Sequence, residues 1–531
     1  MPAEALKISR PTAPRELESA HEGALTRRAT LNLLQSLLDY SAKLVIGLLV
    51  VPILVSGLGR GLFGIWEMLG RWVGYMDSNE GRASQALRLV ISNQRAVDDP
   101  AAKRRWIGGA LIVWLLFLPV WLGLGALLIW LSPMITKVSP ELRDTVRIAC
   151  ALLTAGVLLG GLTSLPESVL RGMNLGYKRM GLQAGLSLLG GALLAGAVYG
   201  GFGLVGVAAI GIVVAGLTGL CFWTVARHQL PWFGIDRPRR AEVGTLLSMS
   251  LWVVGGDLIS KVLMASDVLV LGLVLAPSAV TTYVLTGYGA RLAANLHTLA
   301  SDSAIPGLAG VIGQKDFERA ALIRREIQAI TVLFGTAAGA TILLWNRSFV
   351  HLWVGAENYA GPWIDLLLVV IAVQTAFIRC DAYLIDAALL PERRVRVSAV
   401  SGAAVLVLSL VLTRWGGMVG LCLGIITGRA IQSIWYPVLV QGCIGGSPKL
   451  SAKWLVRPFF FMGLVFAAST YAGQHILVRH WTLWGLAVIL SVILAVGIAL
   501  TLILPADLQE AVIARVKEMT RRLGITRPGR P

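Results

Sequence analysis

Apolar runs of near-bilayer length recur along almost the whole chain, and short polar segments separate them. A helix needs about 20 mostly apolar residues to cross a bilayer, so runs of this kind are typical of transmembrane helices. The pattern predicts about fourteen such helices and therefore an all-α polytopic membrane protein. Their approximate ranges are 31–57, 61–78, 106–131, 147–170, 180–200, 202–226, 242–264, 266–290, 326–346, 363–390, 395–413, 416–440, 455–476 and 482–504.

Composition supports a membrane protein and removes two alternatives. Charged residues make up only 14% of the 531 residues, against about 25% in soluble domains. The formal net charge of +18 would suggest nucleic acid in a soluble protein, but cytoplasmic loops of membrane proteins accumulate basic residues, so no nucleic-acid partner is expected. The five cysteines form no CxxC or Cys/His cluster, and we expect neither a metal site nor disulfides.

Basic residues gather in alternate loops, which predicts that both termini face the cytoplasm. The segment 1–30 is then a cytoplasmic arm, and 506–531 is a basic cytoplasmic tail. Its amphipathic part, 508–523, either lies on anionic lipid headgroups or is a disordered basic end. The basic loops carry Arg88, Arg95, Lys103, Arg104 and Arg105; Arg237, Arg239 and Arg240; Lys315, Arg319, Arg324 and Arg325; and Arg393, Arg394 and Arg396.

The two halves of the chain resemble each other at several positions. Asp39 and Lys43 precede Asp257 and Lys261 by 218 residues, and Gly203-Leu204-Val205-Gly206 is echoed by Gly417-Met418-Val419-Gly420. Six spans per half make both halves enter the membrane from the same side, which predicts a parallel repeat. We therefore expect two six-helix lobes, 31–226 and 242–440, joined by a cytoplasmic linker, 227–241. Two additional helices follow in 441–505.

Ionisable residues inside the predicted spans are the candidate functional residues. Each costs roughly 2.5–3.5 kcal/mol at the centre of a lipid-spanning helix, so such residues usually face a protein interior or a watery cavity. Lys43 with Asp39, and Lys261 with Asp257, are spaced i,i+4 and share a helical face. Each pair either serves an anionic substrate or forms a structural ion bridge. Two further i,i+4 pairs are Glu67 with Arg71 and Glu167 with Arg171, and a structural role is favoured for the second.

The span 363–390 carries the most charge, and its side chains are expected to line a cavity. Arg379 and Tyr383 share a helical face, as do Tyr383 and Asp386, and Asp381 lies between them. In the span 416–440, Arg429 has no opposite charge near it in sequence. It needs a partner from another helix or a ligand phosphate, for which the guanidinium is well suited. Asp267 lies close to a predicted turn and is expected to face water.

The segment from Asn32 to Leu89 carries a family pattern. A long apolar run contains Val51-Pro52-Ile53-Leu54 and Gly57-Leu58-Gly59, and Phe63-Gly64-Ile65-Trp66 follows. The segment resembles the first two helices of the polysaccharide (Wzx-type) flippases of the multidrug/oligosaccharidyl-lipid/polysaccharide exporter superfamily. The arrangement of twice six helices plus two is similar to that family as well. After the second span the family's acidic position is displaced, to Asn79-Glu80-Gly81, so no role is assigned to Asn79.

The resemblance implies a flippase in the bacterial cytoplasmic (inner) membrane. Its substrate would be a polyprenyl-diphosphate-linked oligosaccharide used for O-antigen or exopolysaccharide, and its partners would be membrane lipids and other polysaccharide-assembly proteins. No cofactor is expected. The candidate cavity residues for the substrate are Lys43, Lys261, Arg71, Arg379, Arg429 and Tyr383, and the acids that pair with them or carry a coupling ion are Asp39, Asp257, Glu67, Asp381 and Asp386.

Two other classes of protein stay open. A cation-coupled multidrug antiporter belongs to the same superfamily, but buried Lys and Arg on several spans favour an anionic cargo. A membrane polysaccharide polymerase or ligase would be an enzyme, yet the predicted outer loops are short and no nucleotide-binding glycine motif is present, so no catalytic residues are assigned. The energy source stays open between a proton gradient and a sodium gradient, because the sequence contains no ATP-binding motif.

Overall fold

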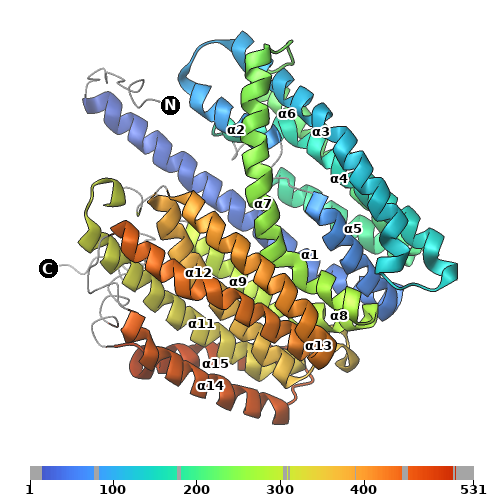
Figure 1. Ribbon diagram of the computed structural model, residues 1–531, viewed down its shortest axis with the longest axis vertical. Helices are drawn as coiled ribbons and strands as arrows, with labels where there is room; N and C mark the ends of the chain where they lie inside the picture. The colour runs from blue at the N-terminus through green and yellow to red at the C-terminus, as the bar shows by residue number, and fades with distance from the viewer. Residues whose placement is uncertain are drawn as a thin grey trace. The chain divides into compact units, whose positions relative to one another are not determined.

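The computed structural model describes residues 15–76, 83–175, 181–302, 308, 311–388, 390–444, 452–505 and 509. Within these residues the secondary structure is helical throughout, without a strand (Figure 1). Nine of the described helices are long and apolar enough to cross a membrane. The prediction of an all-α polytopic membrane protein is confirmed.

The chain folds into two compact units. Unit 1 consists of Met1–Leu54, Met76–Leu127 and Ile148–Val254, and its boundaries fall inside helices rather than in loops. Its core contains Leu87, Ile107, Leu170 and Leu246, all of which are almost completely buried. The helices that begin in the first half of the chain are α1 (Arg15–Met76), α2 (Ala83–Asn93), α3 (Pro100–Ile135), α4 (Arg143–Gly172), α5 (Leu182–Tyr199) and α6 (Gly203–Gln229).

Unit 2 consists of Val55–Tyr75, Leu128–Arg147 and Gly255–Pro531. Its core joins Met68 of α1 to Leu271, Tyr283 and Val369, so part of the first half of the chain folds with the second half. Figure 1 shows α14 and α15 beside α11. The remaining helices are α7 (Arg240–Val274), α8 (Pro277–Thr286), α9 (Tyr288–Asp302), α11 (Phe317–Val354), α12 (Pro362–Ala387), α13 (Pro391–Ile444), α14 (Val456–His475) and α15 (Trp481–Ile498).

The elements α1 and α13 each contain two helices that meet at a glycine, as the separate spans predict. The spans 31–57 and 61–78 fall in α1, which is interrupted at Gly59 with φ 75° and ψ 164°. The spans 395–413 and 416–440 fall in α13, which is interrupted at Gly417 with φ 56° and ψ −134°. The chain turns back at Gly417, because a Cβ on Gly424 would lie 2.6 Å from the Ser409 Cα. Glycine adopts a positive φ at little cost because it has no Cβ.

One predicted boundary is wrong. The turn expected near residue 265 does not exist, because α7 continues to Val274. The chain breaks instead at Pro277, the first residue of α8, and again at Gly287 before α9. Proline has no amide hydrogen. It therefore fits the first turn of a helix, where the amide groups have no acceptor within the helix, but it interrupts a helix at interior positions, where that hydrogen bond is lost. Asp267 therefore lies within α7 rather than in a turn.

The internal repeat is visible in the backbone. Gly203 and Gly417, which match in the sequence repeat, both have φ 56°. The second glycine of each motif is also tightly packed. A Cβ on Gly206 would lie 2.2 Å from the Cβ of Phe202, and a Cβ on Gly420 would lie 1.9 Å from the carbonyl oxygen of Leu412. Both motifs thus require glycine for the same two reasons.

Candidate functional site

The short helix α2 is amphipathic, and its apolar side anchors it in unit 1. Ala86, Leu87 and Ile91 are fully buried in the core of that unit. The last residue of α4, Gly172, lies against α2 so closely that a Cβ there would be 2.9 Å from both the Arg88 carbonyl oxygen and the Ile91 Cβ. This close packing brings the polar side of α2 next to the C-terminal turns of α4.

A cavity of about 380 Å³ lies between α1, α2 and α4, within unit 1. This volume is within the range of about 300–1,000 Å³ that is usual for small-molecule sites. Every residue of its lining is polar or charged, which is unusual because such sites are mostly apolar. The lining consists of Lys43 from α1; Ser84, Gln85 and Arg88 from α2; and Ser164, Glu167, Ser168 and Arg171 from α4.

The described lining of this cavity carries a net positive charge. Arg171 and Glu167 form the ion pair expected from their spacing, with Nη2 2.7 Å from Oε1. The other two cations, Lys43 and Arg88, are exposed, and no described residue forms an ion pair or hydrogen bond with either charged group. Three cations against one carboxylate leave an excess of positive charge, so the cavity favours an anionic ligand.

The neutral groups of the cavity offer hydrogen-bond acceptors. Ser168 donates its hydroxyl hydrogen to the Ser164 carbonyl oxygen at 3.0 Å, and Ser164 donates to the Gly161 carbonyl oxygen at 2.8 Å. The oxygen lone pairs of both hydroxyls stay available. The Oε1 atom of Gln85 is buried without a hydrogen-bond donor among the described residues. Cations together with free acceptors suit a ligand that carries both an anionic group and hydroxyls.

The two lysines of the repeated motif lie in different surroundings. Lys43 lines the cavity of unit 1, whereas the ammonium group of Lys261 lies in unit 2 and donates to the Gly74 carbonyl oxygen at 2.7 Å. Tyr75 in turn donates to the Lys261 carbonyl oxygen at 3.3 Å. The side chains of Asp39 and Asp257 lie outside the described residues, so both i,i+4 pairs stay predictions.

The expectation that Asp267 faces water is wrong. The side chain is only partly exposed, and its Oδ2 accepts a hydrogen bond of 3.1 Å from the buried Tyr283 hydroxyl. Glu67 and Arg71 are partly buried in the same unit. No ion pair joins these two within the described residues, although their spacing would permit one. The sequence missed the contact of Asp267 because it depends on the position of α8.

The two predicted site carboxylates of α12, Asp381 and Asp386, are paired with arginines from other helices. Asp381 accepts two hydrogen bonds from Arg324 of α11, at 2.7 and 2.9 Å, and both side chains are almost fully buried. Asp386 forms an ion pair of 2.7 Å with Arg394 of α13. Arg379 and Tyr383 are partly buried on α12, and neither belongs to the described lining of the polar cavity.

Arg429 obtains partners from two other helices, one of the two outcomes that the sequence left open. Its Nη1 donates to the Thr375 hydroxyl at 2.7 Å, and its Nη2 donates to the Leu263 carbonyl oxygen at 2.5 Å. Both acceptors are neutral, and the side chain is buried. Arg429 therefore holds α13 against α12 and α7 in unit 2.

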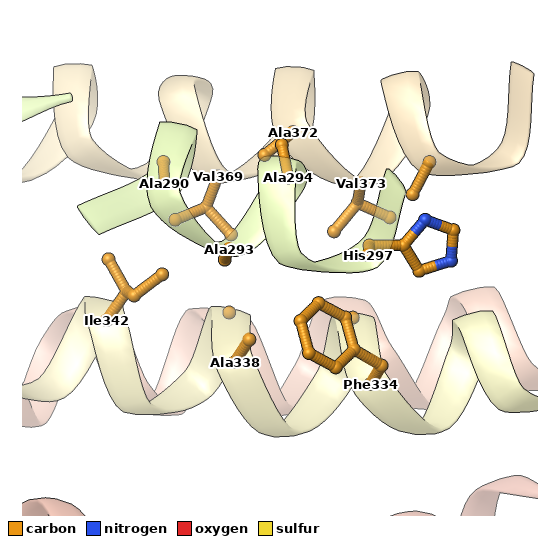
Figure 2. Close-up of a pocket in the computed structure, with 13 residues that line it drawn as sticks. Ala290, Ala293, Ala294, His297, Phe334, Ala338, Ile342, Val369, Ala372 and Val373 are labelled. Carbon is orange, nitrogen blue, oxygen red and sulfur yellow. The ribbon is translucent and has the colours of Figure 1, made fainter. Parts of the chain in front are cut away.

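A second, much smaller cavity lies between α9, α11 and α12. Figure 2 shows its alanine-rich lining, with the rings of His297 and Phe334 at one end. His297 Nε2 lies 2.9 Å from the Thr331 hydroxyl, so one of its ring nitrogens is satisfied. The cavity has a volume of about 20 Å³, which is enough for roughly one water molecule. It cannot hold a lipid headgroup, and we assign it no binding role.

The residues that sequence reasoning missed are mainly those of α2. The sequence places Arg88 in a basic loop, and Gln85 and the serines of α4 are uncharged, so none of them stands out within an apolar span. The amphipathic pattern of 83–93 was the available sign, because it predicts a helix with one apolar and one polar side. The partner of that polar side could not be read from the pattern.

The described helices give the fold of a multi-pass helical membrane protein, and solved structures with a similar fold are known. The lipid II flippase MurJ, in an inward closed conformation, has a similar structure with a TM-score of 0.65. The two sequences are 11% identical, and the match covers 88% of this chain and 97% of MurJ. At this identity the likeness establishes the fold.

Two solved structures of multidrug resistance transporters of the MATE family, one inward-facing and one outward-facing, are similar as well. The inward-facing one has a TM-score of 0.59 at 14% identity, and the match covers 79% of this chain and 99% of the transporter. The outward-facing one has a TM-score of 0.52 at 16% identity, with 79% and 97% covered. No protein-family model and no curated protein sequence matches the chain.

Proposed function

We propose that this protein is a flippase for a polyprenyl-diphosphate-linked oligosaccharide. It would move the headgroup from the cytoplasmic to the outer leaflet of the bacterial cytoplasmic membrane by alternating access, for the assembly of O-antigen or exopolysaccharide. The observation that carries the proposal is the cavity of unit 1, in which Lys43 and Arg88 lack partners among the described residues.

The chemistry of that cavity suits such a headgroup. A diphosphate and its sugars must cross about 30 Å of hydrocarbon, where unpaired charge and unsatisfied hydroxyls are strongly disfavoured. The excess cations of the cavity can replace the water around the diphosphate. Ser164 and Ser168 can accept hydrogen bonds from sugar hydroxyls. The similar structure of MurJ, a flippase of lipid II by its name, supports transport of a lipid-linked substrate on this fold.

Complementation of a strain that lacks the corresponding flippase tests the proposal. Lys43→Ala and Arg88→Ala should each reduce surface polysaccharide, and the double variant should abolish it. Arg237→Ala is the matched control, because Arg237 is an exposed basic residue outside the cavity. Protein levels in the membrane are measured in parallel. Full polysaccharide in the double variant at normal protein levels would rule out the cationic cavity as the substrate site.

A cation-coupled multidrug antiporter is the second candidate, because the inward-facing and outward-facing structures of MATE family transporters have a similar fold. Glu167 is the one carboxylate in the lining of the cavity, and Arg171 already neutralises it. A cationic drug would therefore meet unpaired positive charges in that cavity. Expression in a drug-sensitive strain distinguishes the two functions: increased resistance to cationic drugs, without any effect on polysaccharide, would favour the antiporter.

A further inference from the structure

The polar cavity of unit 1 contains a carboxylate that opposes the binding of an anionic ligand. Glu167 is the one acid in the described lining, and its Oε1 atom lies 2.7 Å from Nη2 of Arg171. We propose that Glu167 is a built-in competitor for the ligand: it holds Arg171 until an anionic group replaces it, and it thereby keeps binding weak enough for release. This role rests on the proposed function, because it takes the ligand of the cavity to be anionic.

Both members of the ion pair can be reached from the cavity. The side chain of Arg171 is 40% exposed and that of Glu167 is 20% exposed, and both residues belong to the lining. A phosphate group that enters the cavity therefore meets the same guanidinium that Glu167 holds. Guanidinium groups bind carboxylates and phosphates with the same planar geometry. The ligand and Glu167 thus compete for one partner.

The ion pair is not needed to hold α4 in place. Pairs that are exposed to this degree contribute little to stability. Arg171 lies in the last turn of α4, where the helix dipole already favours a cation. The end of α4 is fixed by apolar packing, because Val169 and Leu170 are fully buried in the core of unit 1. A purely structural role would therefore gain little from this pair.

The origin of the charges explains why Glu167 holds one cation of the lining and not the others. Lys43, Arg88 and Arg171 come from α1, α2 and α4, and Glu167 comes from α4 as well. Residues four positions apart on one helix are neighbours regardless of how the helices pack. Glu167 therefore neutralises Arg171. Lys43 and Arg88, which have no ion-pair partner among the described residues, attract the ligand.

This competition affects the lifetime of the bound ligand. Two cations can bring an anion into the cavity, and a third adds a further charge-assisted hydrogen bond. Differences in affinity at one site are mostly differences in dissociation rate. A ligand that must share Arg171 with Glu167 leaves sooner than a ligand that has Arg171 to itself. Fast release suits a transporter, because its site must release the ligand in every cycle.

Binding of farnesyl diphosphate to the full chain in detergent tests the proposal. We expect Glu167→Gln to bind this probe about tenfold more tightly than the native protein does, which is the factor expected for one charge-assisted hydrogen bond. The gain should appear mainly as slower dissociation. Glu392→Gln is the matched control, because Glu392 and Arg396 have the same i,i+4 spacing outside the cavity lining. It should bind the probe as the native protein does.

Three results would overturn the proposal. Unchanged affinity in Glu167→Gln would make the pair structural, and weaker binding would mean that Glu167 positions Arg171 for the ligand. Absence of binding by both proteins would exclude an anionic ligand and with it the proposed function. The complementation test of Lys43 and Arg88 is independent of this measurement. Tighter binding by Glu167→Gln together with full polysaccharide in that double variant would support the competitor and refute the proposed function.

Discussion

Arg324 and Asp381 form a two-point ion pair between α11 and α12, with Nε 2.7 Å from Oδ1 and Nη2 2.9 Å from Oδ2. The side chains are 3% and 5% exposed. The sequence does not predict this pair, because 57 positions separate the two residues. The contact satisfies two charges that would otherwise be buried alone, and it therefore governs the stability of unit 2.

Removing the arginine of this pair should strongly destabilise the protein. We expect Arg324→Ala to cost about 3–5 kcal/mol, because it leaves the Asp381 carboxylate buried without the ion pair. Thermal unfolding in detergent measures the effect. Arg396→Ala is the control, since its pair with Glu392 is 3.7 Å long and well exposed, and such pairs contribute little. An equal loss in both variants would contradict this explanation.

The two repeated lysines should respond differently to the same substitution. Lys43→Ala should weaken the binding of an anionic headgroup about tenfold or more, because it removes a charge-assisted contact. Lys261→Ala should mainly lower the melting temperature, because it removes the hydrogen bond to the Gly74 carbonyl oxygen. Binding of farnesyl diphosphate and thermal unfolding are measured for both variants. A stable Lys261→Ala protein with lost binding would reverse this assignment.

The kink of α13 should depend on glycine at one position only. Gly417 has φ 56° and ψ −134°, a conformation that residues with a Cβ rarely adopt. We expect Gly417→Ala to cost about 1–3 kcal/mol through backbone strain. The neighbouring Gly416 has open space around it and no positive φ, so Gly416→Ala should be nearly neutral. Thermal unfolding of the two variants makes the comparison, and similar melting temperatures would show that the kink tolerates a side chain.

The distribution of basic loops predicts that both termini face the cytoplasm. Green fluorescent protein fused to either end should fluoresce, because it folds in the cytoplasm, and alkaline phosphatase fused to either end should stay inactive. A fusion of alkaline phosphatase after residue 137, in a predicted outer loop, should be active and serves as the positive control. Active phosphatase at either terminus would overturn the predicted orientation.

Most of the helices could be predicted from the sequence because each depends on a local property. The last two predicted spans, 455–476 and 482–504, match α14 and α15 closely, since their apolar runs end at polar residues. The breaks between spans were predicted unevenly. The helices on either side of Gly59 and of Gly417 are separate, as the predicted spans have them, whereas α7 continues past residue 265 to Val274. An apolar run that continues through a turn hides the break, so the position of the turn depends on the surrounding packing.

The candidate site was only partly predictable. Lys43 was identified because a charge inside an apolar run is costly and therefore conspicuous. Arg88, Gln85 and Ser168 were not identified as site residues, because each is ordinary in its own segment. Their convergence depends on the contact between Gly172 and α2, where there is no room for a Cβ. That contact joins segments about 80 residues apart.

The sequence by itself determined the class of this protein: a repeated, helical membrane protein with charges inside its spans. The thickness of the bilayer sets the length of each apolar run, and that length can be measured within one segment of the sequence. Only the tertiary structure decided which charges are neutralised, as in Arg324 with Asp381, and which have no partner among the described residues, as in Lys43 and Arg88. The distances between side chains on different helices decide this, and they follow from close packing rather than from spacing along one helix.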